Sequence, residues 1–175
     1  MQGVKAWIPS TEKVSYIQSL LSVGFDVLDV GSFVSKRSIP QMKDSRKVLE
    51  SLDLSSTTSK LLYIVANLRG ALEACVYPEI DFLGFPFSVS ENFQMRNTNK
   101  TINQSLEELK KIISVCKSND KEVVVYLSMG FGNPYGDEWS YEVLEKWISV
   151  IKSIGVKTIS ISDTIGVANP KNIDI

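Results

Sequence analysis

A chain of 175 residues, 43% of them hydrophobic and 22% charged, has the composition of one ordinary globular domain. Its formal net charge is −1, and no cluster of Lys and Arg lies among aromatic residues, so the basic surface typical of nucleic-acid-binding proteins is excluded. No apolar run approaches the ~18 residues of a membrane span, and no basic segment followed by an apolar stretch opens the chain. We expect a single cytoplasmic domain over residues 1–175, without a nucleic-acid or membrane partner.

Helical patterns with recognisable ends are spread along the chain. The first carries three apolar residues on one face and a glycine where helices commonly end: Val14, Ile17, Leu21 and Gly24. A second keeps a 3.6-residue period after a capping box of Thr101 and Gln104, and a third opens at Ser140 and stops at Gly155. Two weaker helical patterns cover residues 43–52 and 70–76.

Five short runs rich in β-branched residues predict strands between these helices. They are residues 27–34, 61–67, 80–88, 123–129 and 158–161. Strands that alternate with helices pair in parallel through right-handed crossovers. An open doubly wound sheet and a section of a (β/α)₈ barrel both fit this order. Five strands complete an open sheet but not a barrel, which typically takes ~250 residues, so the pattern alone favours the open sheet.

Polar residues gather at the predicted carboxyl ends of the strands, where parallel α/β folds build their sites. Asp29 interrupts an apolar run, and a carboxylate there must be paired, bound to a ligand or protonated, so a functional role is favoured over a structural one. Asp163 follows the last strand, where a functional role and a helix cap remain equally open. Other polar residues at strand ends are Ser32, Asn67, Ser88, Ser90, Glu91 and Thr164.

The glycines at 130, 132 and 136 do not form a nucleotide-binding loop. Their spacing is one residue too long for the dinucleotide fingerprint, and no Gly-Lys-Ser/Thr follows. We expect a tight turn over residues 133–136. Cys75 and Cys116 lie in helical stretches without C-x-x-C spacing and are expected to be buried and outside any disulfide. The chain has no histidine, so it must do without the commonest acid/base and metal ligand or leave them elsewhere.

Several short motifs stand in an order that one known family shares. They are Ser32-Phe33-Val34-Ser35 with Ile39-Pro40-Gln41-Met42 and Asp44; Asn67-Leu68-Arg69-Gly70; Ser90-Glu91 with Phe93, then Asn97 with Asn99; Pro134-Tyr135-Gly136; and Ser162-Asp163-Thr164-Ile165-Gly166-Val167. Together they resemble S-F-V-S…V-P-Q-M-x-D, N-L-K-G, S-E-x-F…N-x-N, C-P-Y-E-G and G-D-T-I-G-V of the hydroxymethylglutaryl-CoA lyases, a branch of the metal-dependent, aldolase-like TIM barrels.

This resemblance implies a partial (β/α)₈ TIM barrel, with residues 1–175 supplying strands two to six, and so replaces the open sheet. The chain would be an incomplete pyruvate carboxyltransferase-type domain, truncated at both ends. Gln2 would match the last residue of the family's R-D-x-x-Q motif. The metal-binding Asp of that motif, the H-x-H metal ligands and the catalytic-Cys loop would lie outside the chain. A divalent metal, Mg²⁺ or Mn²⁺, would then belong to the full-length protein, with no ligand here.

The activity implied by the resemblance is metal-dependent cleavage of a 3-hydroxyacyl-CoA to acetyl-CoA and a keto acid. Asp29 stands where the family has a Glu that assists proton transfer, and its reach is one methylene shorter. Asp163 would help to orient the substrate. The candidates for the acyl-CoA pocket are Gln2, Ser32, Asn67, Tyr126, Ser160 and Thr164. The fragment alone is expected to be inactive, and a homodimer is possible at full length.

Two further departures from the family lie within the matched region. Lys36-Arg37-Ser38 replaces the family's P-K-W, which would change substrate contacts near that loop, and Met129 stands where many relatives carry Cys. Other readings stay open at this point. One is a carboxyltransferase-like synthase that runs the condensation, one is a non-catalytic remnant that acts as a binding element, and one is a small-molecule binder with an open sheet.

Overall fold

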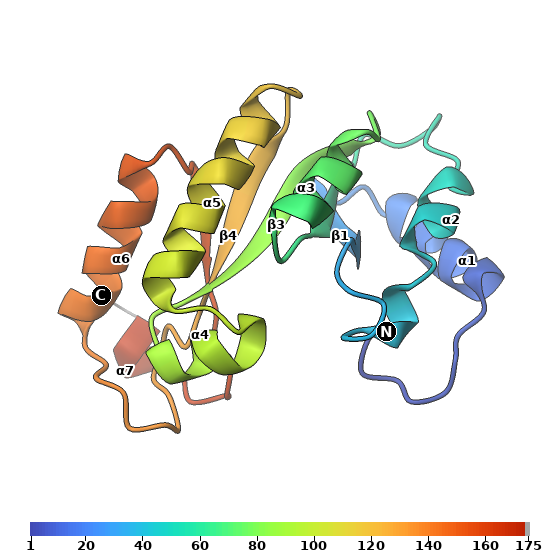
Figure 1. Cartoon of the computed structure of the whole chain (residues 1–175). Helices are drawn as coiled ribbons and strands as arrows, with labels where there is room; N and C mark the ends of the chain where they lie inside the picture. The colour runs from blue at the N-terminus through green and yellow to red at the C-terminus, as the bar shows by residue number, and fades with distance from the viewer. Residues whose placement is uncertain (174–175) are drawn as a thin grey trace. The chain divides into compact units, whose positions relative to one another are not determined.

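The computed structural model describes residues 1–173, and its elements alternate between helix and strand along the chain (Figure 1). The strands form one sheet in the order β1-β2-β3-β4-β5, so sequence neighbours are also sheet neighbours. A doubly wound sheet reverses its strand order at a switch point, whereas a barrel adds its strands consecutively. The strand order therefore favours the barrel section over the open sheet. The chain divides into two compact units, Met1–Leu83 and Gly84–Ile175.

The first unit holds two strands and their helices. In chain order these are α1 (Ser10–Leu21), β1 (Val27–Ser32), the 3₁₀ helix η1 (Pro40–Met42), α2 (Ser45–Glu50), β2 (Lys60–Ile64), α3 (Leu68–Cys75) and the start of β3 (Ile80–Ser88). Helix α1 contacts both α2 and β1. Fully or nearly fully buried side chains from these elements form the core of the unit, among them Ile17, Leu21, Val48, Leu49, Leu61, Tyr63 and Ala71.

The second unit continues from β3 with the same alternation. It contains α4 (Glu91–Thr98), α5 (Ile102–Lys117), β4 (Glu122–Ser128), α6 (Tyr141–Ser153), β5 (Thr158–Ile161) and α7 (Pro170–Ile173). Helix α5 contacts both α4 and β4, and Figure 1 shows it running alongside β4. The core of this unit includes Phe85, Phe87, Leu109, Ile112, Val125, Leu127 and Ile151.

All five predicted strands are present, and the third and fifth have the predicted bounds. The first two are shorter at their carboxyl ends, which stop at Ser32 and Ile64. The capping box of Thr101 and Gln104 is confirmed, as is the N-cap at Ser140. Helix α4 was not predicted, because its sequence E-N-F-Q-M-R-N-T shows no apolar stripe. Its N-cap, Ser90, and its buried Gln94, which donates to Ser105 Oγ at 2.7 Å, hold it instead.

Strand β1 carries a bulge that changes which of its residues share a face. Asp29 pairs with Leu62 of β2 and Ser32 pairs with Ile64, with the register shift between Asp29 and Gly31. Because Leu62 and Ile64 are two residues apart, they lie on one face of the sheet. Asp29 and Ser32 therefore share that face although they are three residues apart, an odd spacing that a regular strand would place on opposite faces.

Cys116 is buried as predicted, whereas Cys75 is only partly buried, and neither takes part in a disulfide. Among residues 1–173, none of the helices combines the length and apolar character needed to cross a membrane.

Candidate functional site

Asp29 lies at the surface, and the prediction that it is enclosed in an apolar strand is wrong for this structure. Its side chain is exposed, while Val30 and Ser32 that follow it are buried. The apolar residues on both sides suggested a strand covered on both faces, but β1 is exposed at Val27 and Asp29 and becomes buried only from Val30 onward. The carboxylate is thus accessible to a ligand without first being desolvated.

Ser32 is placed beside Asp29 by the bulge. The side chain of Ser32 is buried, with 4% of its surface exposed, and its Oγ finds no hydrogen-bond partner within residues 1–173. The backbone N–H of Ser32 donates to Ser45 Oγ at 3.4 Å. Buried hydroxyl groups are nearly always hydrogen-bonded, so this unpartnered oxygen is a candidate contact for a bound molecule or a water.

Asn67 has a clear structural role at the start of α3. Its Oδ1 accepts from the backbone N–H of Gly70 at 2.9 Å, which makes it the N-cap of the helix. At Gly70 itself, a Cβ would lie 2.5 Å from the backbone oxygen of Phe33, so only glycine fits. Two residues of the N-L-R-G motif thus have structural explanations: Asn67 caps the helix, and Gly70 allows two backbone segments to approach closely. These explanations do not depend on a contact between Asn67 and a ligand.

Gln2 lies in an exposed turn, and the segment that follows it is held by groups that sequence reasoning missed. The side chain of Gln41 donates to the backbone oxygens of Val4 (2.9 Å) and Ala6, and accepts from the N–H of Ile8 at 3.3 Å. Lys13 is buried beneath this segment, with its Nζ 3.9 Å from the ring centre of Trp7. Gln41 was part of the family motif P-Q-M. The burial of Lys13 was not expected, because the apolar pattern of its helix gave no reason to place a lysine inside.

Lys13 forms a buried ion pair with Asp44. Its Nζ lies 2.7 Å from Asp44 Oδ1, and Ser10 Oγ donates to Asp44 Oδ2 at 2.7 Å. Burial acts to raise the pKa of Asp44, but the hydrogen bonds from Lys13 and Ser10 and the charge of Lys13 outweigh it, so the pKa lies below the ordinary value. The Asp of the P-Q-M-x-D motif therefore anchors α1 to the segment that contains η1.

Two candidates of the second unit, Tyr126 and Ser160, face each other across neighbouring strands. Tyr126 of β4 and Ser160 of β5 are register partners in a parallel pair. Directly opposed residues project their side chains from the same face, so Tyr126 and Ser160 lie side by side on one face of the sheet. Both residues are only partly buried, unlike Val125 and Leu127 on the other face of β4. The pairing of these two predicted pocket residues follows from the strand register.

Asp163 shapes the turn that follows β5. Its two oxygens accept from the backbone N–H groups of Val167 (3.0 Å) and Ala168 (2.8 Å), and the bonds from Ala168 and Val167 lower its pKa. The sequence left open whether Asp163 has a functional role or caps a helix. In the structure its carboxylate accepts backbone N–H groups of a turn, and not those of a helix. Thr164 Oγ1 accepts from Met129 N–H at 2.8 Å, so it holds the end of β4, where Met129 has a positive φ of 60°.

The serines and the glutamate at and directly after the end of β3 have structural roles. Ser88 Oγ donates to Ser128 O at 3.3 Å, and Ser90 Oγ accepts from Phe93 N–H at 3.1 Å as the N-cap of α4. Glu91 Oε2 accepts from Ile102 N–H at 3.0 Å and so supports the start of α5. The turn predicted at residues 133–136 is confirmed, because Asn133 Oδ1 accepts from Tyr135 N–H at 3.0 Å.

The described part of the chain, residues 1–173, does not fit a metal site. There is no histidine in the sequence, and residues 1–173 contain no group of three or more Cys, Asp and Glu side chains placed to hold an ion. Two local pairs are brought together instead: Asp29 with Ser32 in the first unit, and Tyr126 with Ser160 in the second. Both pairs present oxygen atoms near the carboxyl ends of their strands.

Comparison with known proteins agrees with this architecture. The chain is 28% identical over 176 residues to the hydroxymethylglutaryl-CoA lyase YngG of Bacillus subtilis, covering 99% of this chain and 58% of that protein. It is 29% identical to the cytoplasmic 3-hydroxy-3-methylglutaryl-CoA lyase of Rattus norvegicus, with 97% of this chain and 49% of that protein covered. The chain thus spans about half the length of these relatives.

Solved structures give the same result and decide the fold. The crystal structure of the Bacillus subtilis HMG-CoA lyase matches 98% of this chain and 57% of its own, with a TM-score of 0.92 and 28% identity. An HMG-CoA lyase from Acinetobacter baumannii in complex with coenzyme A and 3-methylmalate matches 98% of this chain and 55% of its own, with a TM-score of 0.90 and 25% identity. These matches identify the five-stranded sheet as part of a TIM barrel. With residues 1–174 matched by the HMGL-like family, the chain belongs to that family.

Proposed function

We propose that this chain contributes to a carbon–carbon lyase that cleaves a 3-hydroxyacyl-CoA into acetyl-CoA and a keto acid, of the hydroxymethylglutaryl-CoA lyase type. The observation that carries the proposal is the match of 98% of the chain to the Bacillus subtilis HMG-CoA lyase with a TM-score of 0.92. The Acinetobacter baumannii relative is described in complex with coenzyme A and 3-methylmalate, which supports an acyl-CoA substrate for this chain.

The proposed reaction needs a base for the 3-hydroxyl proton and an environment that stabilises the developing enolate. We assign proton transfer to Asp29, because its carboxylate is exposed on the same face as the buried, unpartnered Ser32 Oγ. Asp163 has a lowered pKa and is therefore ionised near neutral pH. Both of its oxygens hold backbone N–H groups, so it serves by fixing the turn after β5 and orienting the groups around it.

The acyl-CoA pocket is proposed to include Gln2, Ser32, Asn67, Tyr126, Ser160 and Thr164. The best-supported contacts are the side chains of Tyr126 and Ser160, which project from one face of the β4–β5 pair. Asn67 and Thr164 are engaged by backbone N–H groups, so they would act on a ligand mainly by positioning the loops that they cap.

The family is in general metal-dependent. Mg²⁺ or Mn²⁺ is proposed from the resemblance alone. The side chains within residues 1–173 do not fit a metal site, and none of the roles assigned to them involves a metal. A cytoplasmic location is also proposed. The relative from Rattus norvegicus is described as cytoplasmic, whereas the one from Arabidopsis thaliana is described as mitochondrial.

A chimera tests the proposed function directly. The segment of the Bacillus subtilis lyase that matches residues 1–175 is replaced by this chain, and acetyl-CoA release from 3-hydroxy-3-methylglutaryl-CoA and other 3-hydroxyacyl-CoA substrates is followed by a coupled assay. Cleavage of at least one substrate well above the level of an empty-vector preparation supports the lyase. A chimera with the circular dichroism and melting behaviour of the parent but no cleavage of any of them would refute it. The same preparation, supplied with acetyl-CoA and a keto acid, reports condensation and so tests the synthase alternative.

A further inference from the structure

The loop over residues 129–139, which follows β4, is fastened to α4 by the side chain of Asp137. Asp137 Oδ2 accepts from Ser90 Oγ and from the backbone N–H of Asn92 (3.0 Å), and Oδ1 accepts from Asn92 Nδ2 at 2.5 Å. A carboxylate at the start of a helix interacts favourably with the helix dipole and with the unpaired N–H groups there. In this chain the carboxylate comes from a loop 45 residues further along the sequence.

A second layer of contacts joins the same loop to the same helix. The ring of Tyr135 lies 6.5 Å from the ring of Phe93, and the guanidinium of Arg96 lies 5.0 Å from the centre of the Tyr135 ring. Asn133 shapes the loop from within: its Oδ1 accepts from Asp137 N–H at 3.1 Å and its Nδ2 donates to Asp137 O at 2.9 Å. The loop is therefore built to present the Asp137 carboxylate to α4.

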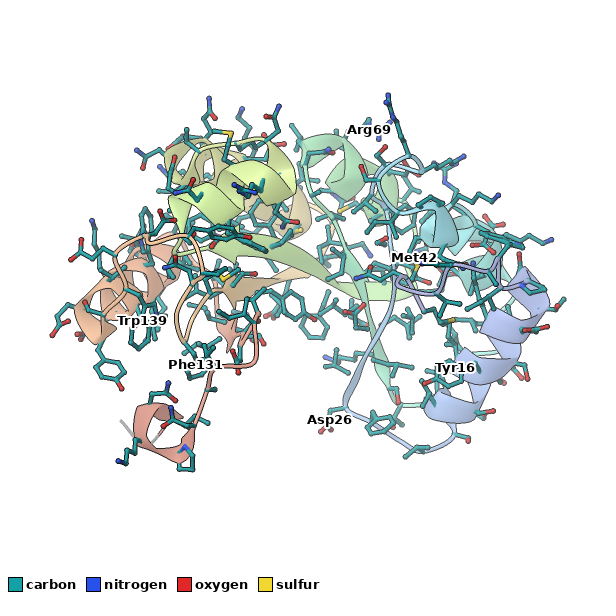
Figure 2. All side chains as sticks on the ribbon, turned by 90° about the horizontal axis from the view of Figure 1, so that it is seen from below. Tyr16, Asp26, Met42, Arg69, Phe131 and Trp139 are labelled. Carbon is teal, nitrogen blue, oxygen red and sulfur yellow. The ribbon has the colours of Figure 1, made fainter. Side chains whose placement is uncertain are left out.

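The loop is also tied to the turn after β5. Met129 N–H donates to Thr164 Oγ1 at 2.8 Å, and Gly130 N–H donates to Ser162 O at 3.2 Å. Trp139 Nε1 donates to Gly130 O at 3.1 Å and closes the base of the loop; Figure 2 labels the side chains of Phe131 and Trp139 that the loop contributes. Gly132 and Gly136 have positive φ angles, which permit the tight course of the loop and leave it able to adopt other conformations once released.

We infer that Asp137 is a latch: by binding the first turn of α4 it couples the segment after β3 to the loop after β4, which is itself hydrogen-bonded to the turn after β5. The latch is a positioning residue, since it acts on the pocket candidate Thr164 only through the loop. Its ionised form is the one that all three donors favour. The hydrogen bonds from Ser90 and then Asn92 hold the pKa of Asp137 below its usual range against the opposing effect of burial. The inference concerns the coupling of these segments and does not depend on the reaction proposed above.

Hydrogen exchange followed by mass spectrometry on the 175-residue chain tests the latch at neutral pH. Asp137→Asn should speed exchange by at least ~10-fold both in the loop over residues 129–139 and in α4, in line with the loss of hydrogen bonds to a charged group. Asn92→Ala removes one donor on the helix side and should loosen the loop as well, by a smaller factor. Glu138→Gln removes a neighbouring exposed carboxylate and is the matched control, with parental exchange expected in both segments.

The latch is wrong if Asp137→Asn leaves α4 at its parental exchange rate, or if Asn92→Ala changes α4 but not the loop. Exchange in β4 is the internal reference for global unfolding. If Asp137→Asn also loses protection there, the milder Asn92→Ala variant decides between coupling and no coupling.

Discussion

Lys13 Nζ lies 2.7 Å from Asp44 Oδ1, and the two side chains expose only 3% and 11% of their surface. Breaking a buried pair leaves one charge uncompensated, which costs far more than breaking an exposed pair. We expect Lys13→Met to lower the free energy of unfolding by about 3–5 kcal/mol, measured by urea denaturation.

Lys110→Met is the matched control for this change. It breaks the exposed pair with Glu107, also 2.7 Å long, and should cost less than ~0.5 kcal/mol. Equal effects of the two substitutions would show that Lys13 contributes no more than a surface lysine.

Acid should destabilise the protein through carboxyl groups whose pKa is lowered in the folded state, among them Asp44, Asp137 and Asp163. Each group contributes stability that is present above the unfolded pKa of about 3.9 and lost as the pH falls through its lower folded value. The urea midpoint should therefore decline as the pH falls from about 5 to 3. Asp163→Asn should flatten this decline, because the amide cannot titrate, while Asp26→Asn, at an exposed carboxyl group, serves as its control. A decline of unchanged steepness in Asp163→Asn would show that Asp163 does not contribute to it.

The capping role of Asn67 can be measured separately from any contact that it makes with a ligand. Asn67→Ala should cost about 0.5–2 kcal/mol of stability through loss of the N-cap on Gly70 N–H, whereas Asn67→Asp keeps an acceptor and should be nearly neutral. Gly70→Ala should lower the free energy of unfolding by about 1–3 kcal/mol, because a Cβ would meet the Phe33 oxygen at 2.5 Å. Its effect should be at least as large as that of Asn67→Ala. Chemical denaturation of the three variants measures these differences. A stable Gly70→Ala protein would contradict the close approach.

Asp29 is the residue to test for proton transfer, in the chimera with the Bacillus subtilis lyase. Asp29→Asn keeps the size of the side chain and removes its ionisable group, so turnover should fall by at least ~10²-fold. Folding should be little changed, because the side chain is exposed. Asp29→Glu restores the reach of the family's residue and should be tolerated. Turnover by Asp29→Asn within a few-fold of the parent would show that Asp29 does not carry the proton.

The isolated 175-residue chain should bind Mn²⁺ no more tightly than the millimolar range. Divalent ions of this kind need several oxygen or imidazole ligands converging on one point. Such a convergence of Asp, Glu or Cys is absent from residues 1–173, and the sequence has no histidine. Calorimetric titration provides the measurement. Binding at micromolar concentration would reveal a site built in a way that these side chains do not suggest.

The positions of the strands and the family membership could be predicted from the sequence. Runs of β-branched residues are local signals, and so is the capping box of Thr101 and Gln104, whose partners are three residues apart. The order of short motifs such as S-F-V-S and N-L-R-G identified the family without any knowledge of contacts. Pattern alone had favoured an open sheet, because alternation of helix and strand does not distinguish a sheet from part of a barrel.

Only the tertiary structure decided which of the polar residues are accessible and which hold the fold together. The bulge in β1 that places Asp29 beside Ser32, the exposure of Asp29 and the burial of Lys13 against Asp44 all depend on partners far away in the chain. Helix α4 also depends on a distant partner, since Asp137 accepts hydrogen bonds from its N-cap and its first turn. A sequence pattern reports the preferences of neighbours along the chain, whereas these features arise from strand register and from side chains brought together by folding.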